Sequence, residues 1–138
     1  YHSDITRTVV IGKASEKQRT IYDLVLRAQL AGITAVKPAK SGSEVDKVAR
    51  QIIAEAGYGN YFGHGLGHGI GLVIHEDPRL SPTAPSDLKL QPGMTITVEP
   101  GVYLPDWGGV RIEDSVVVTA AGCDVLTSSS KQLIEIEY

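Results

Sequence analysis

Histidines gather near the middle of the sequence, in a stretch rich in glycine. Seven glycines fall between positions 57 and 71; His64 and His68 lie among them, and His75 follows shortly after. Alternate glycines let a backbone approach its neighbour closely or adopt a positive φ, while the histidines project from an otherwise bare chain. A glycine-rich turn whose imidazole bonds only to backbone would explain a single histidine. Three clustered imidazoles with carboxylates downstream favour a functional site.

The glycine pattern does not fit a nucleotide-binding loop. A dinucleotide loop needs Gly-x-Gly-x-x-Gly after a strand, and every frame of residues 63–71 fails at the last position. The stretch follows a predicted helix instead of a strand. A phosphate cradle of the Walker type also needs a lysine after its glycine, and none is present there.

Carboxylates downstream could complete a site with the imidazoles. Glu99 ends an apolar run, and Glu113 lies inside the apolar segment 110–118, where strand alternation puts it on the same face as Arg111. A carboxylate in so apolar a strand is costly unless it is paired or bound to a metal. The competing interpretation is an exposed Arg111–Glu113 pair on an edge strand, which stabilises little. Asp4 alone would be interpreted as a turn residue.

Together Asp4, His68, Glu99 and Glu113 offer three carboxylates and one imidazole. Such a set suits Mn²⁺, Co²⁺, Fe²⁺ or Zn²⁺ in a hydrolytic site and differs from a thiolate structural zinc site. The four residues are far apart in sequence and share no local motif. The residue types therefore predict a carboxylate-rich metal site, but they do not show how it is assembled.

Composition narrows the class of protein. The 138 residues suit a single domain, and 42% hydrophobic with 21% charged residues is typical of globular chains. The 13 basic and 16 acidic residues give a net charge of −3, which argues against a nucleic-acid-binding protein. One cysteine, Cys123, allows no internal disulfide and favours a reducing compartment, so we expect a cytoplasmic protein. No apolar run approaches the ~18 residues of a membrane span, so no membrane partner is expected.

Hydrophobic periodicity predicts two helices followed by strands. The first helix should begin at Ser15 and end near Val36; the second should begin at a capping signal formed by Ser43 and Asp46 and end at Gly57. Strands are predicted at residues 5–11, 72–75, 95–99, 101–104, 110–119 and 133–137. The expected fold class is α+β, with two helices covering one face of a curved, mostly antiparallel sheet.

Four motifs, in order, resemble those of the pita-bread metallopeptidases. They are Ser-Asp-Ile-Thr-Arg-Thr at 3–8, the Gly/His run at 63–72 with His75-Glu76, Thr-Val-Glu-Pro-Gly at 97–101, and Gly-Val-Arg-Ile-Glu-Asp at 109–114. Within that family the chain is most similar to Xaa-Pro dipeptidases and Xaa-Pro aminopeptidases. The resemblance implies that residues 1–138 form part of a pita-bread (creatinase/aminopeptidase-like) catalytic domain. It also implies hydrolysis of the Xaa-Pro bond at the N-terminus of a dipeptide or short peptide.

The resemblance assigns metal ligands to this sequence. It implies a centre of two divalent ions (Mn, Co or Zn) that share a water and lower its pKa. Asp4 and Glu113 correspond to carboxylates that bridge both ions, and His68 and Glu99 correspond to ligands of one ion.

The resemblance also assigns substrate contacts. His64 and His75 correspond to imidazoles that contact the substrate and the tetrahedral intermediate, with His75 donating to the oxyanion. Glu99 corresponds to the carboxylate that carries a proton to the leaving proline nitrogen. Arg111 would orient the carboxylates from behind. The family further implies a homodimer.

The sequence departs from the family pattern at its start. The family's first aspartate ligand precedes the position of Asp4 by a little over ten residues, and this sequence starts at Tyr1. We therefore expect a C-terminal part of a longer catalytic domain, inactive by itself and binding at most one divalent ion weakly.

Other functions on the same fold remain open at this point. They are a creatinase-like hydrolase without metal, a non-enzymatic module that binds peptides, and a methionine aminopeptidase-like enzyme. Retention of all four ligand types argues against the first two, and residues 110–114 are closer to the proline-specific branch. The sequence does not separate a dipeptidase from an aminopeptidase.

Overall fold

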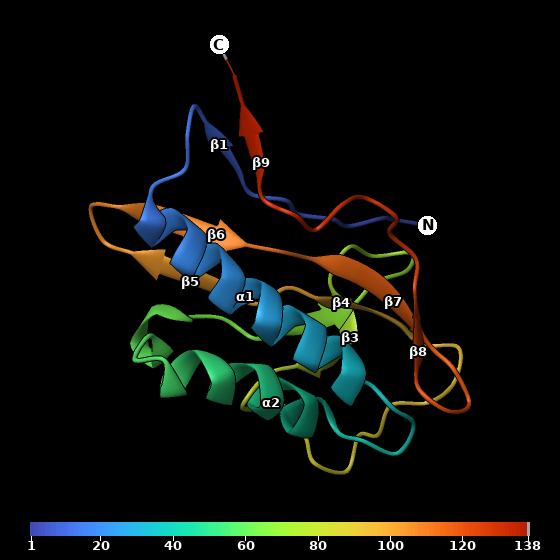
Figure 1. The fold of residues 1–138 in the computed structure, drawn as a ribbon. Coiled ribbons are helices and arrows are strands. Elements are labelled where there is room, and N and C mark those ends of the chain that lie inside the picture. The colour runs from blue at the N-terminus through green and yellow to red at the C-terminus, as the bar shows by residue number, and fades with distance from the viewer. Residues whose placement is uncertain (138) are drawn as a thin grey trace.

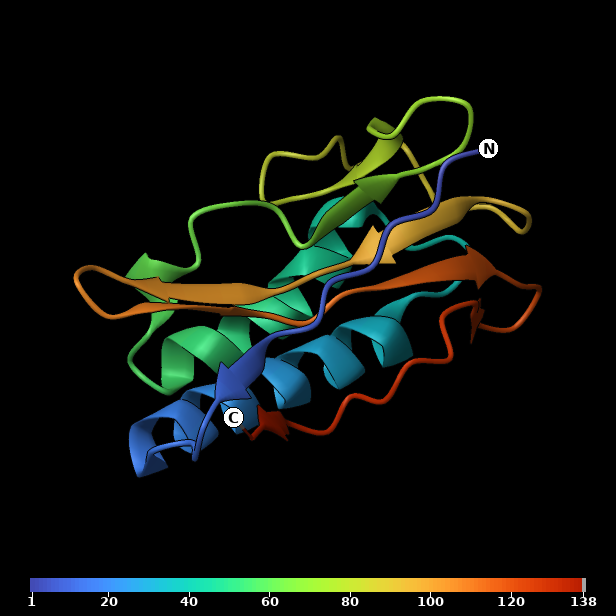
Figure 2. The same cartoon turned by 90° about the horizontal axis from the view of Figure 1, so that it is seen from above.

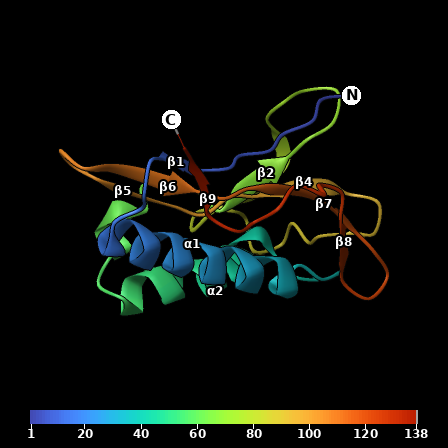
Figure 3. The same ribbon diagram turned by 45° about the horizontal axis from the view of Figure 1, so that its top comes forward.

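Two helices lie side by side and form one layer of the structure (Figure 1). They are α1 (Glu16–Ala35) and α2 (Gly42–Glu55), and the computed structural model describes residues 1–137. Both helices cover the same face of the sheet, and the segment that leads from the N-terminus runs on the other side (Figure 3). No helix within residues 1–137 is long and apolar enough to cross a membrane.

The helix ends follow local capping chemistry. The Ser15 side chain accepts from the backbone of Gln18, whose side chain accepts from the Ser15 backbone, so the predicted start of α1 is confirmed. Its predicted end is confirmed as well, since Val36 is the C-cap. Gly57 follows α2 with φ of +87° and provides the left-handed residue expected there.

The predicted start of α2 is wrong by two residues. Ser41 is the N-cap in place of Ser43, and the carboxylate of Glu44 reaches back to the Ser41 backbone N–H at 2.8 Å. Both Ser-x-x-acid patterns satisfy the same sequence rule. Asp46 is committed instead to Arg50 and to the backbone N–H of Leu66, so Ser43 has no partner for a box.

Five strands form the main sheet in the order β3-β2-β4-β7-β8, and every neighbouring pair is antiparallel. They are β2 (Gly67–Gly69), β3 (Glu76–Leu80), β4 (Thr95–Val98), β7 (Asp114–Val118) and β8 (Cys123–Val125). A hairpin joins β5 (Gly101–Leu104) to β6 (Gly108–Arg111), and β1 (Val9–Ile11) pairs in parallel with β9 (Ile134–Ile136). The predicted α+β class, with two helices on one face of a mostly antiparallel sheet, is confirmed.

Some strand predictions are wrong in detail. Residues 72–75 form a loop in which the side chain of Leu72 is 75% exposed, and the strand begins only at Glu76. The Leu-Val-Ile run has strand propensity, but no partner strand lies beside it, so propensity alone misleads there. The predicted strand 110–119 is divided at Glu113, where the chain passes from the β5–β6 hairpin into the main sheet. The β8 and β2 strands were not predicted.

Only the end of the predicted strand 5–11 forms a regular ladder, namely β1. The segment before β1 does not. It makes one isolated bridge, between Thr6 and Glu113. Side chains supply further links, since the hydroxyl of Ser115 donates to the carbonyl of Asp4 at 2.8 Å and the hydroxyl of Thr8 donates to the carbonyl of Arg111 at 2.9 Å. Figure 2 shows this segment running across the strands toward β1.

A closed apolar core lies between the helices and the sheet. Its buried members include residues from both helices and from β4, β6 and β7, namely Ile21, Val25, Ala28, Val45, Ala49, Ile53, Ile96, Val98, Val110 and Val116. Each fully buried aliphatic side chain contributes about 1.5–3 kcal/mol. Because strand residues alternate, Ile96 and Val98 enter this core while Thr97 points to the opposite face. The polar cluster described below lies on that opposite face.

Candidate active site

The glycines around His68 allow strands to approach one another. A Cβ on Gly67 would lie 1.9 Å from the carbonyl oxygen of Thr97, and one on Gly69 would lie 2.2 Å from that of Asp77. Neither glycine has a positive φ. Of the two reasons that the sequence offered for alternating glycines, close approach is therefore the one that applies at these positions. His68 therefore lies in β2 between two flanking strands. A residue larger than glycine at position 67 or 69 would not fit between them.

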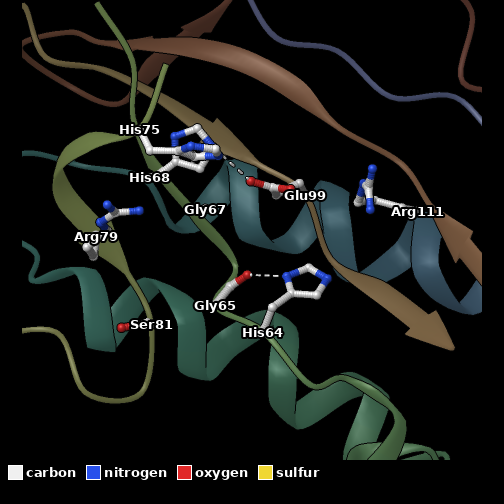
Figure 4. A pocket seen from close by; sticks show the side chains of 9 residues that line it. All are labelled: His64, Gly65, Gly67, His68, His75, Arg79, Ser81, Glu99 and Arg111. Atoms are coloured by element: carbon white, nitrogen blue, oxygen red, sulfur yellow. Dashed lines mark hydrogen bonds and ion pairs between the residues drawn. The ribbon is translucent and has the colours of Figure 1, made fainter. Parts of the chain in front are cut away.

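His68 presents one ring nitrogen to the carboxylates. Its Nδ1 lies 2.9 Å from the carbonyl oxygen of Gly69, so the Nδ1 proton is donated there. Its Nε2 then faces Glu99 Oε1 at 3.2 Å and Asp4 Oδ2 at 3.8 Å. A backbone carbonyl on one nitrogen and carboxylates at the other is the arrangement of a metal-binding histidine. Figure 4 shows the His68–Glu99 contact at the wall of a cavity.

Glu113 has a buried oxygen without a partner. The side chain is fully buried, Oε2 accepts from the Thr6 hydroxyl at 2.5 Å, and Oε1 has no hydrogen-bond donor among the described residues. Burial, and then the charges of Glu99 and Asp4, raise the pKa of Glu113 to about 7 against the opposing effect of the Thr6 bond. Such an orphaned acceptor is rare in folded proteins.

A divalent cation fits the surroundings of that oxygen. Ligand atoms of Asp4, His68 and Glu113 all lie within 4.8 Å of one another, and Glu99 contacts the same ring nitrogen of His68 that faces Asp4. A cation there would bind the unpartnered oxygen and offset the repulsion among three carboxylates. The exposed Arg111–Glu113 pair considered from the sequence is excluded by the burial of Glu113.

The pKa values of His68 and Glu99 show their mutual interaction. Burial lowers the pKa of His68, but the bonds with Glu99 and the Gly69 carbonyl and the charges of Glu99 and Asp4 outweigh it, so the pKa is raised. Burial likewise raises the pKa of Glu99, and the hydrogen bonds from His68 and Thr97 outweigh it, so the pKa is lowered. Glu99 is therefore ionised near neutral pH, as a metal ligand or a proton acceptor must be.

The other two histidines lie beside this cluster. The ring of His75 contacts that of His68 edge to face, with centroids 4.3 Å apart. His64 Nδ1 lies 2.7 Å from the Gly65 carbonyl, so this nitrogen carries the proton, and Nε2 accepts from the Tyr103 hydroxyl at 2.8 Å. All three histidines line one cavity, as their clustering in the sequence suggested.

Arg111 acts on the carboxylates through a neighbour. Its Nε donates to the Thr6 hydroxyl at 3.2 Å, and Thr6 in turn donates to Glu113. Its Nη1 donates to the Tyr103 hydroxyl at 3.2 Å. Within residues 1–137 it forms no direct ion pair with Glu113 or Glu99. The residue thus links the carboxylate cluster to His64.

The cavity has a volume of about 380 Å³ and opens to solvent. It is lined by His64, Gly65, Gly67, His68, His75, Arg79, Ser81, Glu99 and Arg111 (Figure 4). Arg79 and Ser81 were not predicted from the sequence, and neither were Thr6 and Tyr103. Thr6 lies inside the 3–8 motif, and Tyr103 lies on the same face of its predicted strand as Gly101. The spacing of these two residues does not by itself indicate a role in the site.

Comparison with known proteins shows which family this chain belongs to. Residues 1–120 match the sequence profile of Metallopeptidase family M24. The chain belongs to this family. An Xaa-Pro dipeptidase of Pyrococcus furiosus is 53% identical over 134 residues, which are 97% of this chain and 38% of that protein.

Solved M24-type structures agree with the fold. The Xaa-Pro dipeptidase from Bacillus anthracis is 52% identical with a TM-score of 0.94, and the match covers 97% of this chain and 37% of that one. The X-Pro aminopeptidase from Thermotoga maritima is 42% identical with a TM-score of 0.92, over 97% of this chain and 38% of that one. The fold is therefore part of a pita-bread fold, as the resemblance implied. This M24 chain spans less than two fifths of the length of these relatives.

Proposed function

We propose that this chain supplies the metal-binding and substrate-contacting residues of a peptidase that cleaves the bond between an N-terminal residue and proline. The observation that carries the proposal is the unpartnered buried oxygen of Glu113, which lies in one cluster with Asp4, His68 and Glu99. Two members of this cluster, His68 and Glu99, line an open cavity. The names of the similar M24 proteins, Xaa-Pro dipeptidase and X-Pro aminopeptidase, support this substrate class.

Asp4, His68, Glu99 and Glu113 would hold the metal. Three carboxylates and an imidazole suit Mn²⁺, Co²⁺ or Zn²⁺, and we propose that the complete centre would hold two such ions. The ions, when bound, supply a Lewis acid and a water that ionises near neutral pH.

The remaining residues handle the proton and the substrate. Glu99, ionised beside His68, would accept the proton of the attacking water and pass it to the leaving proline nitrogen. His75, exposed at the cavity beside His68, would donate a hydrogen bond to the oxygen that becomes negative. His64 would contact the proline side of the substrate, because its ring is fixed at the cavity wall by Gly65 and Tyr103.

Two arginines in the cavity favour short substrates. The guanidinium of Arg79 forms no ion pair within the described part of the chain, and Arg111 lines the same cavity. A dipeptide carries its free carboxylate within a few ångströms of the scissile bond, and arginine recognises carboxylates with two parallel hydrogen bonds. We therefore propose that dipeptides bind better than longer peptides. A homodimer and a cytoplasmic location stay predictions from the sequence.

Hydrolysis of a defined peptide panel tests the proposal. The protein in its full natural length, supplied with Mn²⁺, Co²⁺ or Zn²⁺, should cleave Xaa-Pro dipeptides, cleave longer Xaa-Pro peptides less well, and leave Met-initiated peptides without proline intact. Glu113→Ala should abolish hydrolysis because it removes a carboxylate that would hold the metal. Near-normal turnover by that variant, or preference for Met-initiated peptides, would contradict the assignment.

A further inference from the structure

An ion pair on α2 binds the backbone that carries His64. Asp46 and Arg50 are one helical turn apart and form a two-pronged contact, with Nε–Oδ2 at 2.7 Å and Nη2–Oδ1 at 2.9 Å. The side chain of Asp46 is 1% exposed and that of Arg50 is 25% exposed. A pair so well enclosed is unusual for an i,i+4 contact, which is normally a solvated surface feature.

The same two side chains satisfy the backbone of residues 62–66. Arg50 Nη1 donates to the Phe62 carbonyl at 2.9 Å, and Nη2 donates to the His64 carbonyl at 2.6 Å. Asp46 Oδ1 accepts from the backbone N–H of Leu66 at 2.9 Å. The pair therefore holds this segment at three alternate positions, one of which is His64 itself.

Ring contacts continue from the pair to the imidazole. The Arg50 guanidinium lies 4.1 Å from the centre of the Phe62 ring. The Phe62 ring in turn meets the His64 ring edge to face at 5.1 Å. The guanidinium thus supports His64 both through its backbone and through the aromatic ring beside it.

The side chains of Phe62 and Leu66 pack in the core at the two ends of this segment, but its backbone has few partners besides the Asp46–Arg50 pair. Residues 62–66 lie between a short 3-10 turn and β2 and belong to no ladder or helix. A Cβ on Gly63 would meet nothing within 4 Å, so packing does not restrain that residue. Buried backbone groups outside a ladder need other partners, and here the Asp46 and Arg50 side chains supply three of them. In addition to its contacts with Asp46 and Arg50, the segment contacts the carboxylate cluster, because the Leu66 carbonyl accepts from the Glu99 N–H at 2.7 Å.

We propose that the Asp46–Arg50 pair is a clamp that positions His64. It holds the His64 ring against Tyr103 at the cavity wall and does not itself touch the substrate. The role in turnover rests on the proposed function, because it requires that His64 contact the peptide. A shift of about 1 Å in a substrate-contacting group lowers turnover as much as roughly 100-fold. Lysine at position 50 would keep the charge but could not bind two carbonyls and a carboxylate in one plane.

Imidazole ¹⁵N NMR of the metal-free chain tests the clamp directly. We compare Arg50→Lys and Asp46→Asn with Arg19→Lys, which makes the same arginine-to-lysine change in the exposed pair between Arg19 of α1 and Glu135 of β9. In both α2 variants the Nδ1 and Nε2 shifts of His64 should move toward each other as the ring exchanges between tautomers. The shifts of His68, held by Gly69 and Thr97, should stay in place. The control should leave both rings unchanged.

Hydrogen exchange and kinetics add two further readouts. Exchange of the Leu66 amide should accelerate at least about tenfold in Asp46→Asn relative to the control, because a charged acceptor is lost. In the full-length protein, KM for an Xaa-Pro dipeptide should rise about tenfold or more in Arg50→Lys, while metal content stays the same.

Two outcomes would overturn the clamp. One is an unchanged His64 spectrum in both α2 variants; the other is an equal change in His64 and His68, which would indicate general unfolding. If Arg50→Lys does not fold, the His64 and His68 spectra of Asp46→Asn decide whether the clamp positions His64. Because the spectra and the Leu66 exchange require no turnover, a protein that failed to cleave Xaa-Pro peptides would remove the proposed function and leave the clamp standing.

Discussion

One buried oxygen of Glu113 distinguishes between the two interpretations of this carboxylate. The sequence allowed Glu113 to be either an exposed partner of Arg111 or a metal ligand, and the two differ in burial. The side chain is 2% exposed, and one oxygen lacks a donor among the described residues. The cost of leaving that oxygen unsatisfied is the physical reason to expect a cation there.

Gly67 should be intolerant of any side chain. Gly67→Ala puts a Cβ 1.9 Å from a backbone oxygen of β4, and neither strand can move away without breaking the sheet. We expect a loss of at least about 2 kcal/mol in the free energy of unfolding. Gly63→Ala is the matched control, since open space surrounds that position, and its effect should stay within about 0.5 kcal/mol. Urea unfolding measures both, and equal effects would show that close approach does not explain these glycines.

Arg79 should discriminate between free and blocked peptide ends. Arg79→Gln removes a cation from the cavity, so KM for an Xaa-Pro dipeptide should rise by roughly 10- to 100-fold, the range for one lost charge-assisted bond. The same change should leave KM for the C-terminally amidated dipeptide nearly unaltered. A parallel loss for both substrates would indicate that Arg79 supports the cavity instead of binding a carboxylate.

At the scale of elements, α2 contributes more to the site than its sequence suggested. Its periodicity predicted a core helix, and Val45, Ala49 and Ile53 are indeed buried. Its charged residues Asp46 and Arg50 do not lie on a fully solvated face, since the side chain of Asp46 is 1% exposed and that of Arg50 is 25% exposed. A pattern of helical periodicity shows which face is apolar, but it does not show which backbone segment crosses the helix.

The start of α2 gives a pH-dependent contribution to stability. The backbone N–H of Ser41, then the Lys40 and Ser41 side chains, lower the pKa of Glu44 from 4.5 to about 2. A depressed folded-state pKa adds stability that is present above the ordinary pKa and is lost as pH falls toward 2. Glu44→Gln keeps the capping geometry without a charge. The difference in unfolding free energy between the two proteins should be largest above pH 4.5 and shrink at lower pH.

Urea titrations at pH 6 and pH 3 measure this difference. Asp124→Asn, an exposed carboxylate on β8, serves as the control and should show little change between the two pH values. A Glu44→Gln difference that is the same at both pH values would contradict the account of this helix start.

Local rules therefore predicted some elements better than others. Both helices followed from apolar periodicity, and capping residues predicted the start of α1 but missed that of α2 by two residues, because those signals act within a few residues. The strands near the histidines did not follow from local rules. β2 consists of glycine and histidine with no strand propensity, and it exists because β3 and β4 flank it. For the same reason the types of the site residues were evident from the sequence, but their convergence was evident only from the family resemblance.

At the scale of the whole molecule, one buried carboxylate joins three distant segments. Asp114 accepts from Arg7 near the N-terminus at 2.7 Å, from Gln29 of α1 at 2.8 Å and from Lys131 near β9 at 2.5 Å. Arg7 also donates to the Glu113 carbonyl at 2.5 Å. Burial raises the pKa of Asp114, and these bonds outweigh it and lower the pKa. The segment that carries Asp4 is thereby fixed against the strand that follows Glu113.

Loss of that charge should release both terminal segments. Asp114→Asn leaves two partly buried cations, Arg7 and Lys131, without their fully buried anionic partner, and we expect a loss of about 3–5 kcal/mol in the free energy of unfolding. Hydrogen exchange should accelerate first in residues 4–8 and 129–136, ahead of the helices. An effect as small as that of the exposed Asp124→Asn change, or exchange that rises uniformly, would contradict this role.

A metal titration tests the central claim, that Asp4, His68, Glu99 and Glu113 form one divalent-metal centre. Calorimetry with Co²⁺, followed by the visible spectrum of the complex, should show binding to the chain and stabilisation of its fold by about 2.7 kcal/mol at 100 times Kd. His68→Ala and Glu113→Gln should each weaken binding strongly, while His2→Ala, an exposed residue outside the ligand group, should not. Binding that persists unchanged in both ligand variants, or no binding to the unaltered chain, would contradict the assignment of this centre.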